Sequence, residues 1–300
     1  MRGKIVIPKF YKKRHDDKTG RSARSKILLD GISKIYDMRI EYTYEPNFDD
    51  VDFALVYAIP YHNRPEIPPR FFDTKPNKKL ICYFEDLQCW DNKLCKQNKL
   101  KMFERYDVLI GTYNEKFRDW YPQFVDKYIF YPDYFAPYNR FSVLKPNPKP
   151  ILKCLLSGTV NKYYPFRQYI HRHLSEKILK YRKKNILFAD YPKFLNSYFC
   201  AIATGSSVSI PLAKYFEIPA AGTLLLAERV NDLDLMGMKP GVHYVEINRK
   251  NVAKKIRTVL KNPKKFIKIR NRATKFVRAN HSEINRIKEF ENVLKFIGVR

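Results

Sequence analysis

The chain has 300 residues, of which 45% are hydrophobic and 15% aromatic, and its 58 Lys and Arg against 30 Asp and Glu give a formal net charge of +28. This apolar fraction excludes a disordered chain and suffices for one large domain or two of ordinary size. No apolar run approaches the roughly 20 residues of a membrane span. The N-terminus lacks a signal-peptide pattern, so we expect a soluble, cytoplasmic protein. Five cysteines without paired spacing predict neither a disulfide framework nor a zinc site.

The positive charge has two interpretations. A strongly basic surface attracts polyanions such as DNA, an anionic membrane surface or a phosphorylated small molecule. The lysines are spread along the whole chain, however, so the charge can equally be compositional and serve only solubility. Residues 261–278, KNPKKFIKIRNRATKFVR, form a basic helical pattern that fits a DNA or membrane contact or a solvated face.

The first half of the chain alternates apolar runs with helical patterns. The predicted strands are short apolar segments between polar or turn residues, at 4–10, 39–44, 52–59, 79–84 and 106–113. Helical patterns occur at 27–36 and 91–106. Because strands that alternate with helices favour parallel sheets, residues 1–140 are predicted to form a Rossmann-like α/β domain.

A proline-rich segment at 132–150 marks a boundary, after which the alternation resumes. The predicted strands of the second half are 151–159, 185–190, 199–205, 223–227 and 243–247, and the predicted helices are 164–182, 191–198, 209–218, 251–262 and 263–297. Residues 141–285 should therefore form a second Rossmann-like domain, and 286–300 a C-terminal helix that packs back on the first. In such pairs of parallel-sheet domains, ligands bind in a central cleft at the carboxyl ends of the strands.

The segment LLSGTVNKYYPFR (155–167) has the pattern of an anion site. A strand leads into a small-residue turn that contains Gly158 and Thr159, and a helix begins near Pro165. The free N–H groups and the positive dipole of the helix start attract an anion, and Lys162 and Arg167 could neutralise a diphosphate. The segment lacks a Walker A or GxGxxG pattern, so an ordinary strand–helix turn with solvated cations is the alternative.

The segment AKYFEIPAAGTLLLAE (213–228) places one carboxylate, Glu217, inside an apolar approach to a buried strand. Ser209 is the expected N-cap of the helix, and the turn at Gly222 and Thr223 ends it. A carboxylate can accept hydrogen bonds from the two vicinal hydroxyls of a ribose. A partly exposed surface glutamate is the alternative.

From about 151 to 292 the chain resembles the nucleotide-sugar domain of GT-B glycosyltransferases of the group 1 family. The segments that carry the resemblance are, in order, LLSGTVNKYYPFR, YPKFLNSYFCAIAT, KYFEIPAAGTLLLA, GVHYV and NHSEINR. The resemblance implies the GT-B fold, with residues 1–140 as the acceptor-side domain, and a role for Glu217 in binding the donor ribose. It implies a diphosphate site at Gly158, Thr159, Lys162 and Arg167, and we expect Gly222 and Thr223 to complete the donor site.

The resemblance also implies a reaction. We expect a hexosyl- or pentosyltransferase that moves a sugar from a nucleoside-diphosphate donor, UDP-linked in our expectation, to a hydroxyl acceptor such as a glycan. Retaining members carry an acidic residue eight positions before the ribose glutamate, where this chain has Ser209, which favours an inverting reaction. Basic side chains and a helix N-terminus can stabilise the leaving diphosphate, so no metal or cofactor is expected. The DxD triplets at 50–52 and 232–234 are interpreted as chance.

The catalytic base is sought in the first half. KLICYFEDLQCW (79–90) places Glu85 and Asp86 directly after a predicted buried strand, and it resembles the strand–Asp segment of phage DNA β-glucosyltransferases, whose Asp is the base. Asp86 is therefore the first candidate and Glu85 the second, with His15 and Asp16 in reserve; surface loop carboxylates are the alternative. Two other functions stay open: a glycosyltransferase acting on a hydroxylated DNA base, and a non-catalytic polyanion-binding protein with this fold.

Overall fold

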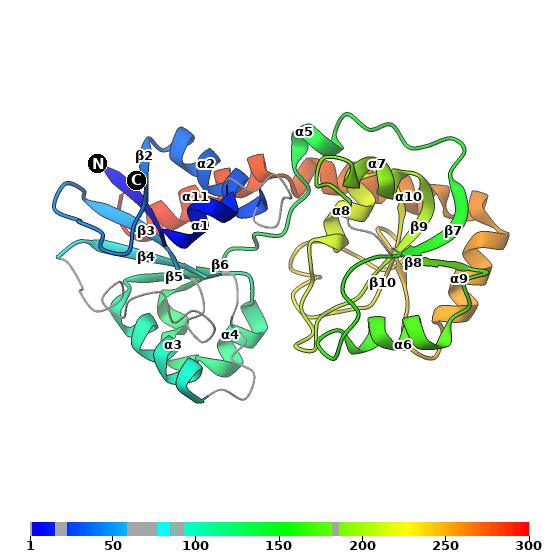
Figure 1. The fold of residues 1–300 in the computed structure, drawn as a ribbon, viewed down its shortest axis with the longest axis horizontal. Helices are drawn as coiled ribbons and strands as arrows, with labels where there is room; N and C mark the ends of the chain where they lie inside the picture. Colours follow the sequence, from blue (N-terminus) through cyan, green and yellow to red (C-terminus); the bar gives the residue numbers. More distant parts are fainter. Residues whose placement is uncertain are drawn as a thin grey trace. The chain divides into compact units, whose positions relative to one another are not determined.

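The computed structural model describes residues 2–15, 23–58, 77–84, 87, 93–181 and 186–299. The chain divides into two compact units, which are described separately here (Figure 1). Unit 1 consists of Met1–Asp133 and Glu283–Arg300, and unit 2 of Tyr134–Ser282. The chain thus completes unit 2 before it returns to unit 1. Within the described ranges, every helix is too short or too polar to cross a membrane.

Unit 1 is built on a six-stranded parallel sheet with the order β2-β1-β3-β4-β5-β6. Its strands are β1 (Gly3–Ile7), β2 (Met38–Tyr42), β3 (Phe53–Ala58), β4 (Lys79–Phe84), β5 (Val108–Gly111) and β6 (Tyr128–Phe130). Ile5, Leu55, Ile81 and Leu109 on the inner strands have no exposed surface. Helices cover both faces of such a sheet, which explains why its strands are continuous apolar runs.

The helices of unit 1 come from both ends of the chain. They are α1 (Phe10–His15), α2 (Ala23–Ile35), α3 (Lys93–Arg105), α4 (Asn114–Trp120), the 3-10 helix η3 (Pro122–Lys127) and the C-terminal α11 (Glu283–Phe296). Helix α11 packs against α2. Its backbone oxygens at Ile287 and Arg286 accept hydrogen bonds from Tyr36 Oη at 3.0 Å and Tyr131 Oη at 2.6 Å. The last helix of the chain therefore belongs to the core of unit 1.

Unit 2 is built on a five-stranded parallel sheet with the order β11-β10-β9-β7-β8. Its strands are β7 (Ile151–Leu156), β8 (Leu179–Tyr181), β9 (Tyr198–Ala203), β10 (Leu224–Ala227) and β11 (Val245–Glu246). Cys154 and Cys200 are free, buried thiols in the core between these strands and the helices. Burial raises the pKa of the Cys154 thiol, so this side chain behaves as a small apolar residue.

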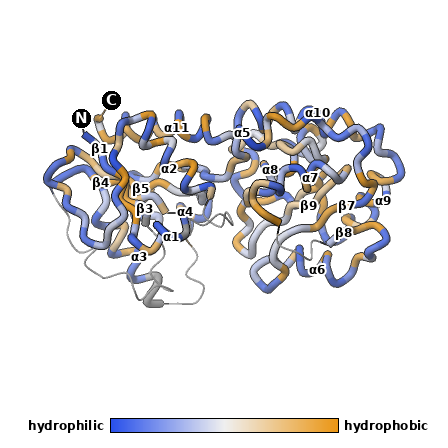
Figure 2. The backbone as a smooth tube through the Cα atoms, turned by 45° about the horizontal axis from the view of Figure 1, so that its top comes forward, coloured by the Kyte–Doolittle hydropathy of each residue, from blue (hydrophilic) through white to orange (hydrophobic). Residues whose placement is uncertain are grey.

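The helices of unit 2 cover this sheet. They are α5 (Tyr138–Phe141), α6 (Pro165–His173), α7 (Tyr191–Asn196), α8 (Lys214–Ala220), α9 (Val252–Lys261) and α10 (Pro263–Asn280). Phe166 and Ile170 of α6 and Ile256 of α9 reach the same core as the strands. Figure 2 shows hydrophobic and hydrophilic stretches alternating along α9 and α10, as expected for helices that pack on one face.

The predicted fold class, α/β with two parallel sheets, is confirmed, but three predicted elements are wrong. The helix predicted at 164–182 ends at His173, because Leu174 takes an extended conformation (φ −106°, ψ 137°) and the chain then pairs with β7 as β8. Residues 186–190 of the predicted strand 185–190 form a loop and turn; 185 lies outside the described residues. The helix predicted at 263–297 is interrupted at His281, whose backbone oxygen accepts a hydrogen bond from Ala136 N.

Candidate functional site

The turn after β7 lies at the carboxyl edge of the sheet, where β9 and β10 also end because the three strands are parallel. Gly158 in this turn has φ +107°, a conformation that favours glycine. A Cβ atom at this position would lie 2.7 Å from Arg167 Nη1 and 3.0 Å from Lys214 Nζ. Because glycine has no side chain, the ends of Arg167 and Lys214 can both lie close to the backbone of Gly158.

Arg167 is the most unusual residue of this edge. Its side chain is only 2% exposed, Nη1 donates to the Thr159 carbonyl oxygen at 2.9 Å, and the guanidinium lies 4.2 Å from the ring centroid of Tyr164. Burial lowers the pKa of Arg167, although a guanidinium keeps its charge in proteins. Its Nη2 is buried without a hydrogen-bond partner. A buried charged donor without a partner is costly, so this geometry suits an anionic ligand that supplies the missing acceptor.

Helix α8 brings a second cation, Lys214, to the Gly158 turn and carries a buried carboxylate, Glu217. Lys214 and Glu217 are three residues apart and thus share one face of the helix. Glu217 is only 6% exposed, which rejects its interpretation as a surface glutamate. Lys214 was missed from the sequence, although its spacing from Glu217 is a signal that could have identified it.

The ends of β9 and β10 add polar groups that were also missed. Glu228, directly after β10, accepts a hydrogen bond from Gly205 N at 3.0 Å through Oε2, and its backbone oxygen accepts one from Tyr215 Oη at 2.9 Å. Burial raises the pKa of the Glu228 carboxyl. Thr204, directly after β9, has a buried Oγ1 without a hydrogen-bond partner. The carboxyl edge of this sheet is therefore polar, whereas the strands that lead to it are apolar.

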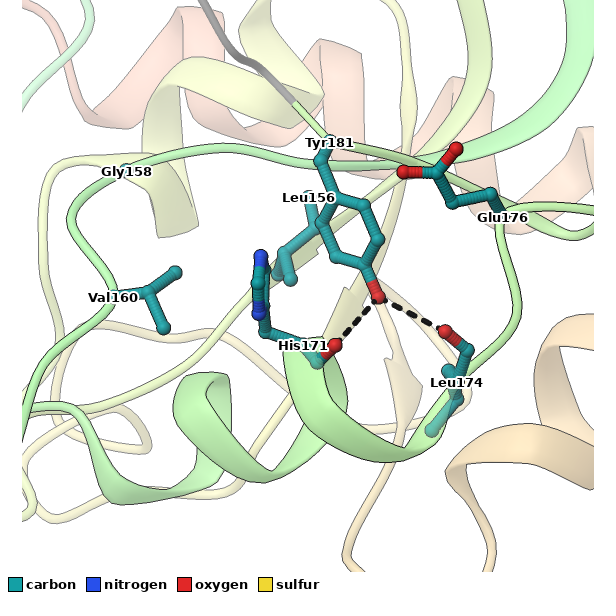
Figure 3. Close-up of a pocket in the computed structure, with 7 residues that line it drawn as sticks. All are labelled: Leu156, Gly158, Val160, His171, Leu174, Glu176 and Tyr181. Atoms are coloured by element: carbon teal, nitrogen blue, oxygen red, sulfur yellow. Dashed lines mark hydrogen bonds between the residues drawn. The ribbon is translucent and has the colours of Figure 1, made fainter.

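An open pocket of about 570 Å³ adjoins the turn (Figure 3). Its lining residues are Leu156, Gly158, Val160, His171, Leu174, Glu176 and Tyr181. Tyr181 Oη donates to the carbonyl oxygens of His171 at 3.2 Å and Leu174 at 3.0 Å, which closes the end of α6. Gly158 thus has the two cationic side chains near its Cα and an open pocket beside it.

Of the other three predicted donor residues, Lys162 lies in the loop after Gly158, whereas Gly222 and Thr223 lie at the other end of the strands. Lys162 is exposed, with Nζ 5.4 Å from the ring centroid of Tyr163. Gly222 (φ +80°) and Thr223 end α8 and precede β10, at the edge of the sheet opposite Gly158. Their N–H groups donate to Pro219 O and Ile218 O, the two bonds of a Schellman motif. The structure therefore gives Gly222 and Thr223 a role in ending the helix, which corrects their expected place in the donor site.

Ser209 is not the N-cap of α8, contrary to the prediction. The helix begins at Lys214, and Ser209 lies in the preceding loop with φ +57°. Its N–H donates to Ser206 O, and its own carbonyl oxygen accepts from Asn231 N. These tertiary hydrogen bonds hold the loop in a conformation that a capping pattern alone does not predict.

The predicted catalytic residues belong to unit 1. Glu85, Asp86 and the reserve residue Asp16 lie outside the described residues, so their roles stay predictions. The strand before Glu85, β4, is an inner strand of the sheet and is buried up to Phe84. His15 is 6% exposed; Nδ1 lies 2.9 Å from Tyr42 Oη and Nε2 3.4 Å from Ser25 Oγ.

The DxD triplets have ion-pair partners within the protein. Asp50 pairs with Lys4 at 3.0 Å and with Arg39 at 2.5 Å, and the hydrogen bond from Lys4 lowers the pKa of Asp50. Asp234 pairs with Arg229 at 2.8 Å. Within the described ranges, no cluster of three or more His, Cys, Asp or Glu side chains is arranged to hold a metal ion.

Substitution of Gly158 tests the turn. In Gly158→Ala the backbone at φ +107° would be strained, so we expect a loss of about 1–3 kcal/mol in the free energy of unfolding. The new Cβ would also displace the ends of Arg167 and Lys214, so we expect a loss of stabilisation by inorganic pyrophosphate. Gly241→Ala is the matched control, since Gly241 also has positive φ (+73°) but no atom within 4 Å of a Cβ. Thermal unfolding with and without pyrophosphate measures both effects. Equal pyrophosphate responses in the two variants would contradict this account of the turn.

The buried carboxyl of Glu228 predicts a pH dependence of stability. Its raised pKa means that the folded state disfavours the ionised form, so a penalty exists at neutral pH and disappears below the ordinary pKa of about 4.3. Glu228→Gln keeps the acceptor oxygen for Gly205 N. We expect it to unfold at a higher temperature than the wild type at pH 7 and at the same temperature near pH 4. Glu115 is exposed, so the unfolding temperature of Glu115→Gln should differ from that of the wild type by the same amount at pH 7 and near pH 4. A Glu228→Gln variant that unfolds at a lower temperature than the wild type at pH 7 would contradict the prediction.

Comparison with known families matches one region of the chain. Residues 149–292, which contain all of the predicted donor segments, match the family described as glycosyl transferase-like. A comparison with curated protein sequences gives no match.

Solved structures match the chain over almost its full length. Sucrose-phosphate synthase from Thermosynechococcus elongatus has a TM-score of 0.68 at 10% identity and covers 99% of both chains. HepE from Anabaena in complex with UDP has a TM-score of 0.66 at 11% identity, over 99% of this chain and 100% of its own. A glycosyltransferase from Rickettsia africae ESF-5 has a TM-score of 0.64 at 11% identity, over 99% of this chain and 98% of its own. The GT-B fold of the group 1 family is thus confirmed, and the family match with the fold identifies an enzyme that transfers glycosyl groups.

Proposed function

We propose that the protein transfers a sugar from a UDP-linked donor to a hydroxyl group of a glycan acceptor. The observation that carries this proposal is the buried Nη2 of Arg167, which has no hydrogen-bond partner. The Arg167 guanidinium lies next to Gly158, where Lys214 Nζ also approaches. Two cationic side chains that meet at a glycine turn can both donate hydrogen bonds to the oxygens of a diphosphate. The structural relatives support the choice of UDP, since HepE was solved with UDP-glucose and a pneumococcal O-GlcNAc transferase with UDP and GlcNAc.

The donor would bind along the carboxyl edge of the unit 2 sheet. The diphosphate would accept hydrogen bonds from Arg167 Nη2 and Lys214 Nζ at the Gly158 turn. Glu217, on the same face of α8 as Lys214, would accept hydrogen bonds from the ribose hydroxyls.

The same residues would assist the reaction. As the bond from the sugar to the diphosphate breaks, negative charge grows on the leaving diphosphate, and Arg167 and Lys214 would stabilise it without a divalent metal. A carboxylate would take the proton of the acceptor hydroxyl as its oxygen attacks the sugar carbon, and Asp86 or Glu85 is proposed for this role. Ser209, in place of an acidic residue, favours inversion at that carbon.

A donor panel tests the proposed reaction. UDP-, GDP-, ADP- and CMP-linked sugars are incubated with the protein in the presence of EDTA, and free nucleotide is measured with and without oligosaccharide acceptors. We expect release of UDP from a UDP-sugar, faster with an acceptor. If no nucleotide sugar is consumed and no nucleotide stabilises the protein against heat, the proposed function is wrong.

A further inference from the structure

Helices α9 and α10 carry a concentration of positive charge that the proposed reaction does not use. Residues 247–282 contain 13 Lys and Arg and no Asp or Glu, whereas the whole chain of 300 residues has 58 basic and 30 acidic residues. We propose that this α9–α10 surface binds the headgroups of a membrane that contains anionic phospholipid. Eleven of the basic side chains are exposed: Arg249, Lys250, Lys254, Lys255, Arg257, Lys261, Lys264, Lys265, Lys268, Arg272 and Lys275.

The apolar sides of the two helices face the protein. Val252, Ile256 and Val259 of α9 belong to the core of unit 2, and Phe266 and Ile269 of α10 pack against that core. Only Asn262 separates the two helices, which contact each other. The exposed cations therefore lie on the solvent-facing sides of neighbouring helices, labelled α9 and α10 in Figure 1.

Among the described residues, the charges on this surface form no ion pairs, although Arg249 is close enough to Glu228 to lower the pKa of that carboxyl. In the described part of the chain, no ion pair includes any of the 13 basic residues, whereas Lys4, Lys26 and Arg39 of unit 1 are all paired. Of the 13, Arg278 is directed inward and donates to the carbonyl oxygens of Ala220 and Leu144. The eleven exposed cations thus create an uncompensated positive field, which attracts a polyanionic surface.

The composition of the surface favours lipid over nucleic acid. Eight of the eleven exposed cations are lysines, which act as point charges and lack the planar fork that reads bases. Its two aromatic side chains are poorly placed to stack on bases, since Phe266 and Phe276 are half-buried and Phe276 stacks on His243. Ile267, 39% exposed next to Lys268, instead offers an apolar group to the interface. Diffuse lysine charge with an apolar side chain is typical of contact with anionic headgroups.

Two fourfold variants with the same change in net charge test the proposal. The surface variant combines Lys254→Gln, Lys255→Gln, Lys264→Gln and Lys268→Gln. The control variant changes four exposed lysines elsewhere in unit 2, Lys145→Gln, Lys149→Gln, Lys177→Gln and Lys239→Gln. Each full-length protein is sedimented with vesicles of phosphatidylcholine, with or without phosphatidylglycerol, at low and high salt. We expect the wild type and the control to bind only the anionic vesicles at low salt, and the surface variant to bind on the order of a thousandfold more weakly.

Three outcomes would overturn the proposal. They are equal loss in the two fourfold variants, absence of binding by the wild type to anionic vesicles, and binding of the wild type to duplex DNA but not to vesicles. Circular dichroism and UDP release from the donor panel check that both variants keep fold and activity, since none of the eight lysines belongs to the donor site. A failure of vesicle binding with intact UDP release leaves the proposed function untouched.

Discussion

Arg167→Met is expected to abolish stabilisation of the protein by UDP and to lower kcat/KM for the UDP-sugar by about 100- to 1,000-fold. The reason is the buried Nη2 without a partner, which a diphosphate oxygen would satisfy. The substitution removes a buried donor that lacks a partner, but it also removes the hydrogen bond from Nη1 to Thr159 O and the attraction between Arg167 and the Glu228 carboxyl. These effects oppose each other, so we expect the free energy of unfolding without ligand to fall by only about 1–2 kcal/mol.

The control for this prediction lies on the same helix. Arg172 of α6 is exposed, so Arg172→Met removes the same charge without touching the turn at Gly158. Thermal unfolding with and without UDP, together with steady-state kinetics, measures both variants. A purely structural Arg167 would predict a large loss of stability without ligand and an unchanged response to UDP, and that result would contradict the proposed contact.

Glu217→Gln is expected to weaken UDP binding by about 10- to 100-fold, the cost of losing charge-assisted hydrogen bonds to the ribose hydroxyls. The substitution keeps the shape of a side chain that is 6% exposed in the first turn of α8. Titration calorimetry with UDP and with inorganic pyrophosphate separates the two parts of the donor. Pyrophosphate has no ribose, so its affinity should be the same in Glu217→Gln and the wild type.

The two ligands also distinguish the two residues. Arg167→Met should lose affinity for both UDP and pyrophosphate, whereas Glu217→Gln should lose affinity for UDP alone. A Glu217→Gln variant that binds pyrophosphate as weakly as UDP would indicate that Glu217 only positions α8 and Lys214. Unchanged UDP affinity would remove Glu217 from the site.

The strands were predictable wherever they are buried on both faces. The inner strands β3, β4, β9 and β10 are continuous apolar runs, and each was predicted within a few residues of its observed bounds. Strand β8 was missed because it is a three-residue edge strand within a segment of helix-forming Lys, Glu and Leu residues. Its pairing with β7, through Cys154 and Leu179, is a tertiary contact that local sequence does not encode.

The candidate site was predictable where its residues follow a strand and a turn in sequence. Gly158, Arg167 and Glu217 belong to contiguous motifs with a physical reason for each residue type. Lys214 and Glu228 were missed because their relevance depends on how α8 and β10 pack beside the Gly158 turn. Gly222 and Thr223 were assigned wrongly because a glycine turn near Glu217 in sequence lies at the opposite edge of the sheet.

A crystal structure of the protein with bound UDP tests the central claim most directly. The account predicts that a diphosphate oxygen lies within hydrogen-bond distance of Arg167 Nη2 and of Lys214 Nζ, at the Gly158 turn. It also predicts that the ribose hydroxyls contact the Glu217 carboxylate. A nucleotide bound elsewhere, with Arg167 Nη2 still without a partner, would contradict the account.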